Sequence, residues 1–120
     1  MVYAYERAEL AKAGRQDLAD RVEMVCKTIG DQAGFDIRSF DRNRFEEMHI
    51  EVKTTSGPAS TAFFMTAAEL EYAKSCALHY VIYRVHEYAP GSTEVRFFVI
   101  ENAPDELEFT PALFRVRQRF

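Results

Sequence analysis

The residues of this sequence whose types and spacing could do chemistry are Asp36, Glu51 and Lys53. Glu51 and Lys53 lie in the run 48–55, where apolar and polar residues alternate with the period of a strand that is buried on one face. Because side chains two positions apart on a strand point the same way, this carboxylate and this ammonium flank one spot. Asp36 lies in a second strand-like run, 35–40, and joins the same face if the two runs pair as a hairpin. Two carboxylates beside a lysine are what metal-dependent cleavage of a phosphodiester requires.

Spacing alone leaves a second explanation open. Lys53 could form a structural salt bridge with Glu51 or Asp36 on a solvated sheet face, where an ion pair generally contributes under about 1 kcal/mol. The metal site requires the hairpin, because only the pairing of the two runs brings Asp36 to this face, so it depends on the elements around it.

The first half of the chain predicts helices followed by this hairpin. Residues 2–13 read as a helix that ends at Gly14, where a stop is expected. A polar turn at 41–44 joins the two hairpin strands, which we therefore expect to be antiparallel. The other segments expected here are a short helix at 18–21, a strand at 23–27, a turn-rich loop at 30–34 and the hairpin strands themselves, 35–40 and 45–55.

The second half predicts one more helix and further strands. Thr66 and Glu69 match the capping box that opens a helix, which we expect to run through Ser75. Residues 78–88 are apolar on both faces, which is typical of a central strand. The other expected segments are a loop at 56–60, a short strand at 63–65, a strand at 95–100 antiparallel to 78–88, a loop at 102–106 and an alternating tail at 114–120. The sequence therefore predicts one α/β domain, residues 1–120, with a central mixed (α+β) sheet flanked by helices.

The composition is that of a soluble globular protein, since 48% of the 120 residues are hydrophobic and 28% are charged. No apolar run approaches the roughly 20 residues of a membrane span and no signal peptide opens the chain, so we expect no membrane association. Cys26 and Cys76 do not make a disulfide framework, which favours buried thiols and a cytoplasmic location. The net charge of −4 argues against a general nucleic-acid coat protein, but it does not exclude a nuclease with an acidic metal site.

Four segments, in this order, carry a family resemblance. They are Gly34–Phe40 (GFDIRSF), Ile50–Thr55 (IEVKTT), Phe63–Ala73 (FFMTAAELEYA) and Tyr80–Val85 (YVIYRV). Together with Tyr5-Glu6 and Ala13-Gly14-Arg15 they resemble the NO VEIN C-terminal domain family over nearly the whole chain. That family is of largely unknown function and is similar to the PD-(D/E)xK, or restriction-endonuclease-like, superfamily.

The resemblance implies a role for each residue of the candidate site. Asp36 would be the metal-binding aspartate, Glu51 the second carboxylate and the backbone carbonyl of Val52 a further ligand. The ion would be Mg²⁺ or Mn²⁺, which takes oxygen ligands, polarises a phosphoryl oxygen and lowers the pKa of a bound water. Lys53 would stabilise charge on the phosphate or orient the attacking water.

Three further residues could support this site. The superfamily commonly carries a glutamate on the first helix, expected just upstream of this chain's start, and Glu6 is the nearest matching acidic position here. His49 shares the strand face of Glu51 and could touch a substrate phosphate, although a strand-surface histidine is the commoner case. Glu69 could support Lys53 or the metal, although closing the helix start comes first.

Two groups of residues could contact nucleic acid. Thr54 and Thr55 end the Glu-x-Lys strand, where their hydroxyls could meet a substrate backbone or simply fill strand positions. Arg115, Arg117 and Arg119 form a basic stripe that could line a phosphate backbone or protect an edge strand from aggregation.

These residues lead to two competing functions. The first is a Mg²⁺-dependent endonuclease-like hydrolase that acts on DNA in preference to RNA, within a homodimer or a larger restriction or phage-defence complex. The second is a catalytically inactive nucleic-acid-binding or protein-interaction module on the same fold. The full set of Asp36, Glu51 and Lys53 favours the first, and the overall acidity favours the second.

Overall fold

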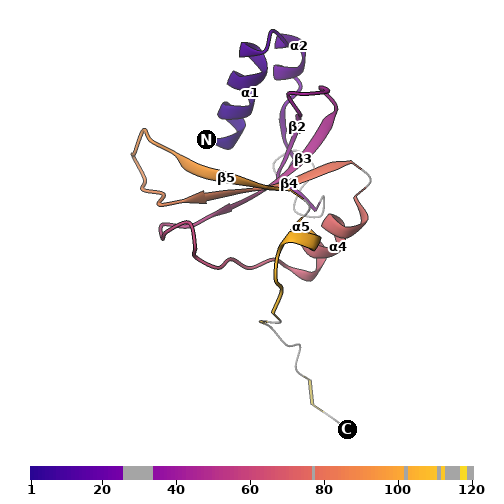
Figure 1. Cartoon of the computed structure of the whole chain (residues 1–120), viewed down its shortest axis with the longest axis vertical. Coiled ribbons are helices and arrows are strands. Elements are labelled where there is room, and N and C mark those ends of the chain that lie inside the picture. Colours follow the sequence, from indigo (N-terminus) through magenta and orange to yellow (C-terminus); the bar gives the residue numbers. More distant parts are fainter. Residues whose placement is uncertain (26–33, 77, 102, 111, 113–116, 119–120) are drawn as a thin grey trace.

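The computed structural model describes residues 1–25, 34–76, 78–101, 103–110, 112, 117 and 118. Within them, five strands form one sheet in the order β1-β2-β3-β4-β5, with β3 and β4 parallel and the other neighbours antiparallel. Helices α1 and α2 lie on one side of this sheet, and α4 and α5 lie on the other (Figure 1). The strands are β1 Glu23–Met24, β2 Ile37–Phe40, β3 Glu47–Thr54, β4 His79–His86 and β5 Arg96–Glu101. The helices are α1 Val2–Lys12, α2 Gln16–Ala19, α4 Ala67–Ser75 and α5 Ala103–Glu106. The predicted mixed α/β architecture is confirmed.

The predicted hairpin is also confirmed, since β2 and β3 are antiparallel with Ile37 opposite Ile50. The Asp41 side chain closes its turn by accepting hydrogen bonds from the backbone N–H groups of Asn43 (3.0 Å) and Arg44 (2.6 Å). Because β2 begins only at Ile37, its ladder accompanies β3 up to Ile50 and stops there. The last residues of β3 therefore extend past the start of β2.

The predicted capping box begins α4. Thr66 Oγ1 accepts a hydrogen bond from the Glu69 N–H at 3.0 Å, and Glu69 Oε1 accepts one from the Thr66 N–H at 2.8 Å. α4 lies in the crossover between β3 and β4, the connection that a parallel pair requires.

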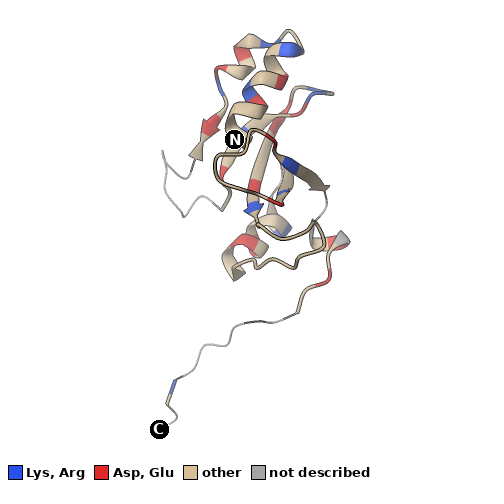
Figure 2. Cartoon of the chain, turned by 90° about the vertical axis from the view of Figure 1, so that its left-hand side faces the viewer, with Lys and Arg blue, Asp and Glu red and all other residues tan. Residues whose placement is uncertain are grey.

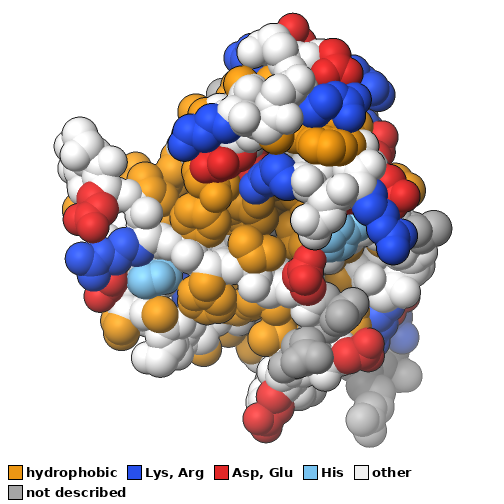
Figure 3. Space-filling model, turned by 45° about the horizontal axis from the view of Figure 1, so that its top comes forward, with side chains coloured by type: hydrophobic (Ala, Val, Ile, Leu, Met, Phe, Trp, Pro, Cys, Tyr) orange, Lys and Arg blue, Asp and Glu red, His pale blue; other side chains and the backbone are white. Residues whose placement is uncertain are grey.

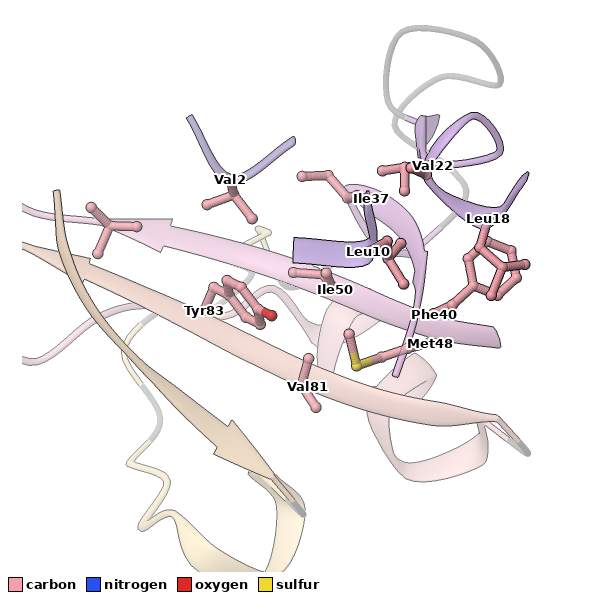
Figure 4. Close-up of a cluster of buried hydrophobic side chains, with 12 residues drawn as sticks. Val2, Leu10, Leu18, Val22, Ile37, Phe40, Met48, Ile50, Val81 and Tyr83 are labelled. Carbon is pink, nitrogen blue, oxygen red and sulfur yellow. The ribbon is translucent and has the colours of Figure 1, made fainter. Parts of the chain in front are cut away.

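Each face of the sheet has its own hydrophobic core. The first lies between the sheet and the helices α1 and α2 (Figure 4), and it includes Val2, Leu10, Leu18, Val22, Ile37, Phe40, Met48, Ile50, Val81 and Tyr83. Seen from the α1 side, apolar side chains gather on the face of the sheet beside α1 (Figure 3). The second core lies under α4, around Val25, Phe35, Tyr80 and Ile82. β4 contributes to both cores, as predicted for a central strand.

Three expectations about the strands and loops are wrong. β3 is buried on both faces, since α4 lies over His49 and Glu51, which are 5% and 4% exposed. Residues 63–65 form no strand, and two of their side chains pack into the second core instead. Residues 103–106, expected in a loop, form α5.

Other expectations shift or cannot be compared. The short second helix begins two residues earlier than predicted, and β1 covers the start of the predicted 23–27 strand, of which residues 26 and 27 lie outside the described residues. Cys26, most of the 30–34 loop, Arg115 and Arg119 lie outside the described residues. Cys76 is a free thiol. In the described part of the chain, no helix is long and apolar enough to cross a bilayer.

Candidate active site

The structure brings Asp36, Glu51 and Lys53 together on the α4 side of the sheet. The Asp36 backbone N–H donates to the Ile50 carbonyl at 2.9 Å, and Asp36 Oδ2 accepts from the Val52 N–H at 2.8 Å. These two bonds hold the carboxylate against β3 just where the β2 ladder ends. Lys53 Nζ lies 3.7 Å from Glu51 Oε1 on the same face. The common face predicted for the three side chains is therefore present.

Glu51 is the buried carboxyl group of this site. The pKa of Glu51 is raised to about 9, chiefly by burial and then by the negative charge of Asp36 and the hydrogen bond and charge of Glu69. The positive charge of Lys53 lowers this pKa. Without a bound cation, this shift favours the protonated form of Glu51 at neutral pH, and a cation at the site would favour the carboxylate. A carboxyl group whose pKa is raised by burial and by neighbouring acids is a typical feature of catalytic and metal sites.

Glu69 performs both of the roles considered for it. Its Oε1 accepts from Lys53 Nζ at 2.9 Å and from the capped Thr66 N–H at 2.8 Å. Although burial opposes the change, these two hydrogen bonds lower the pKa of Glu69. One oxygen atom thus links the start of α4 to the candidate catalytic lysine.

The donor set fits Mg²⁺. Among the residues that the structure describes, no group of three or more His, Cys, Asp or Glu side chains could hold a metal ion. Asp36 and Glu51 are two carboxylates, and Mg²⁺ is usually bound through one or two carboxylates while keeping several waters. The Val52 N–H points toward Asp36, and because the N–H and C=O of a strand residue point to the same side, its carbonyl faces that side as well.

The site lies within a segment that matches a known family. The model of the family described as "Protein NO VEIN, C-terminal" matches residues 1–100, which include Asp36, Glu51 and Lys53. The chain belongs to this family. No curated protein and no solved structure matches the chain. The comparisons thus confirm the NO VEIN resemblance.

Glu6, the nearest match to the superfamily's first-helix glutamate, does not reach the site, because it lies on the opposite face of the sheet. Glu6 is fully buried and accepts hydrogen bonds from Ser39 Oγ (2.8 Å), Tyr83 OH (2.6 Å) and both terminal nitrogens of Arg42 (2.6 and 3.1 Å). The alternation of β2 and β4 places Ser39 and Tyr83 on the α1 side, away from Asp36. In this member of the NO VEIN family, Glu6 ties α1 to the sheet.

His49 is next to the site, but both of its ring nitrogens have partners elsewhere. Nε2 lies 2.7 Å from Glu47 Oε2, and Nδ1 lies 2.5 Å from the Tyr72 hydroxyl. Its ring stacks on Phe35 with the centroids 3.8 Å apart. These contacts match a structural histidine that joins β3 to α4.

The predicted nucleic-acid contacts are placed only in part. Thr54 ends β3 and is exposed, as a substrate contact would require. Thr55 Oγ1 accepts from the Gly57 N–H at 3.1 Å, so its hydroxyl organises the loop. Arg117 is exposed and lies outside any strand.

Sequence reasoning missed Arg84. It is the register partner of Lys53 on β4 and is only 2% exposed. Its guanidinium donates to the Thr61 carbonyl at 3.1 Å and lies 5.0 Å from the centre of the Phe63 ring. An arginine inside the apolar run Tyr80–Val85 was the signal in the sequence that could have identified it.

Proposed function

We propose that this NO VEIN C-terminal domain is a Mg²⁺-dependent nuclease that hydrolyses phosphodiester bonds in DNA. The observation that carries the proposal is the convergence of Asp36, Glu51 and Lys53 at one largely buried spot. A salt bridge on a solvated face, the alternative explanation from spacing, does not account for a glutamate that is 4% exposed beside a second carboxylate.

Each residue has a part in this reaction. Asp36, Glu51 and the Val52 carbonyl would hold the ion, which supplies Lewis acidity and an activated water when bound. Lys53 would bind the phosphate and stabilise the charge that develops on it. Glu69 orients Lys53 from the start of α4. These are the roles that a resemblance to the restriction-endonuclease-like superfamily would imply for these residues.

The proposal includes a setting in a homodimer or a larger restriction or phage-defence complex. Cutting both strands of a duplex requires two active sites, and one such site is found in the described residues. Acidic and basic residues are interspersed along the helices α1 and α2 (Figure 2), so these helices offer no single-sign surface for DNA. Sequence specificity would then come from a partner chain.

A second candidate is a catalytically inactive nucleic-acid-binding or protein-interaction module. The observation in its favour is that Glu6 lies on the far face, so that α1 contributes no carboxylate to the site through this residue. The Lys53 ammonium is also bound to Glu69.

Plasmid nicking in Mg²⁺ or Mn²⁺ tests the proposal. We expect the wild type to nick DNA, and we expect Asp36→Ala and Lys53→Ala to lose this activity while keeping their fold by circular dichroism. Asp17→Ala and Lys12→Ala remove an exposed aspartate and an exposed lysine, and they should cleave as the wild type does. Equal activity in all five proteins would identify a contaminant. A folded wild type that neither cleaves DNA nor binds Mn²⁺ would favour the inactive module.

A further inference from the structure

One aromatic side chain stands out on the connection from β3 to α4. Along residues 61–66, partly buried and exposed side chains alternate as they do in an extended segment. Phe63 and Met65 pack into the second core and leave Phe64 pointing outward, 76% exposed. Because both neighbours are anchored, Phe64 is presented on a fixed segment.

Phe64 lies close to the candidate active site. Two residues further on, the Thr66 N–H donates to Glu69 Oε1, which also accepts from Lys53 Nζ at 2.9 Å. Since consecutive Cα atoms are about 3.8 Å apart, the Cα atoms of Phe64 and Thr66 are within about 8 Å of each other. Through these two hydrogen bonds the Phe64 Cα atom lies within about 15 Å of Lys53 Nζ, a distance that a few nucleotides of an extended strand can span.

A positively charged side chain lies beneath this segment. Arg84 is the register partner of Lys53, and the described residues supply it with no acidic partner. Its Nε atom is buried without a hydrogen-bond partner among them. The buried guanidinium is weakly screened by salt, and its positive potential, with that of Lys53, offsets the negative potential of the nearby Asp36 and Glu69 carboxylates. An apolar protein partner would gain nothing from this potential, whereas a nucleic-acid strand would.

We propose that Phe64 stacks on an unpaired base, and that the substrate strand is single-stranded where it crosses the site. Stacking on an aromatic side chain stabilises single strands with little dependence on sequence. In an intact duplex the base faces are already stacked on each other, so the ring has nothing to engage. The inference rests on the proposed nuclease function and adds the substrate class to it.

Tryptophan fluorescence tests this directly, because the chain has no tryptophan. Phe64→Trp introduces one reporter at the proposed site, and Phe98→Trp places a control on β5, where the side chain is 40% exposed. Each variant is titrated with oligo-dT, oligo-U and a blunt duplex of the same length, with Ca²⁺ in place of Mg²⁺. We expect oligo-dT or oligo-U to quench the fluorescence of Phe64→Trp and to leave that of Phe98→Trp unchanged. The oligo-dT and oligo-U titrations distinguish DNA from RNA.

Affinity measurements complete the test. Phe64→Ala should weaken single-strand binding at least about fivefold, and Phe64→Tyr should retain it. Wild-type affinity in Phe64→Ala, equal quenching of both reporter variants, or a preference for the duplex would overturn the inference. Nicking by the wild type, with no fluorescence change in Phe64→Trp, would reject the stacking role alone. Quenching in Phe64→Trp without cleavage or Mn²⁺ binding would reject the nuclease alone.

Discussion

Glu6 and Glu51 are buried on opposite faces of one sheet, 0% and 4% exposed, and their surroundings differ in kind. Glu6 accepts four hydrogen bonds, two of them from the Arg42 guanidinium. Glu51 has one nearby cation, Lys53, whose ammonium is closer to Glu69. The comparison shows that burial of a carboxylate does not by itself indicate function. A buried carboxylate that is hydrogen-bonded to cationic and hydroxyl partners stabilises the fold. A buried carboxylate that faces other acids is a candidate for binding a cation.

The largest expected loss of stability follows from removing the Glu6 carboxylate. Glu6→Ala would leave Arg42 and Tyr83 without their buried acceptor, so we expect the free energy of unfolding to fall by about 3–5 kcal/mol. Urea denaturation followed by circular dichroism measures this change. Glu9→Ala, on the same helix, should change stability by less than about 0.5 kcal/mol. Similar losses in both variants would mean that the buried network contributes little.

Metal binding at Asp36 and Glu51 should stabilise the protein, and the Glu6 network on the other face of the sheet should not contribute to this effect. At a Mn²⁺ concentration about a hundred times Kd, we expect the wild type to gain about 2.7 kcal/mol in unfolding free energy. Asp36→Ala should show no such gain in a thermal-shift titration. An Asp17→Ala control should respond as the wild type does, and an unchanged response in Asp36→Ala would place the ion elsewhere.

The pH dependence of stability should reveal the Glu51 proton. A carboxyl group whose pKa is raised by folding, here from 4.5 to about 9, makes folding less favourable as pH rises through that interval. Glu51→Gln removes this dependence, so its melting temperature should match that of the wild type near pH 5 and should exceed it by a growing margin as the pH rises toward 9. Melting temperatures across this range, without added metal, measure the difference. A constant difference at every pH would contradict the assignment.

The smallest expected effect belongs to Glu69. Glu69→Gln keeps a side-chain acceptor for the Thr66 N–H but weakens the bond to Lys53, so we expect a loss of stability of about 1 kcal/mol or less. Thr66→Ala removes the other half of the capping box and should cost about 1 kcal/mol without touching Lys53. If the site proposal holds, nicking falls more in Glu69→Gln than in Thr66→Ala.

Local patterns predicted the parts of the structure that depend on neighbouring residues. Strand alternation and a polar turn were enough for the hairpin, and therefore for the common face of Asp36, Glu51 and Lys53. The spacing of Thr66 and Glu69 was enough for the start of α4. These signals extend over a few residues, and tertiary structure did not override them.

Contacts between distant residues could not be predicted in this way. The partners of Glu6 lie 33, 36 and 77 residues away, so no periodicity links them to it. The polar residues His49 and Glu51 indicated a solvated sheet face, but both side chains are buried under α4. That burial could not be predicted, because the sequence of a strand does not show which helix will cover it. Arg84 was missed for the same reason, since its acceptor on the 56–65 connection is a backbone carbonyl.

The two hydrogen bonds of Asp36 to β3 also constrain how the hairpin can form. Side chains alternate with a period of two, so a slip of one residue between β2 and β3 would turn Asp36 toward the α1 core and away from Glu51. That slip would also break both bonds and bury the carboxylate among apolar side chains. The aspartate that we propose as a metal ligand would thus also help to fix the register of the hairpin.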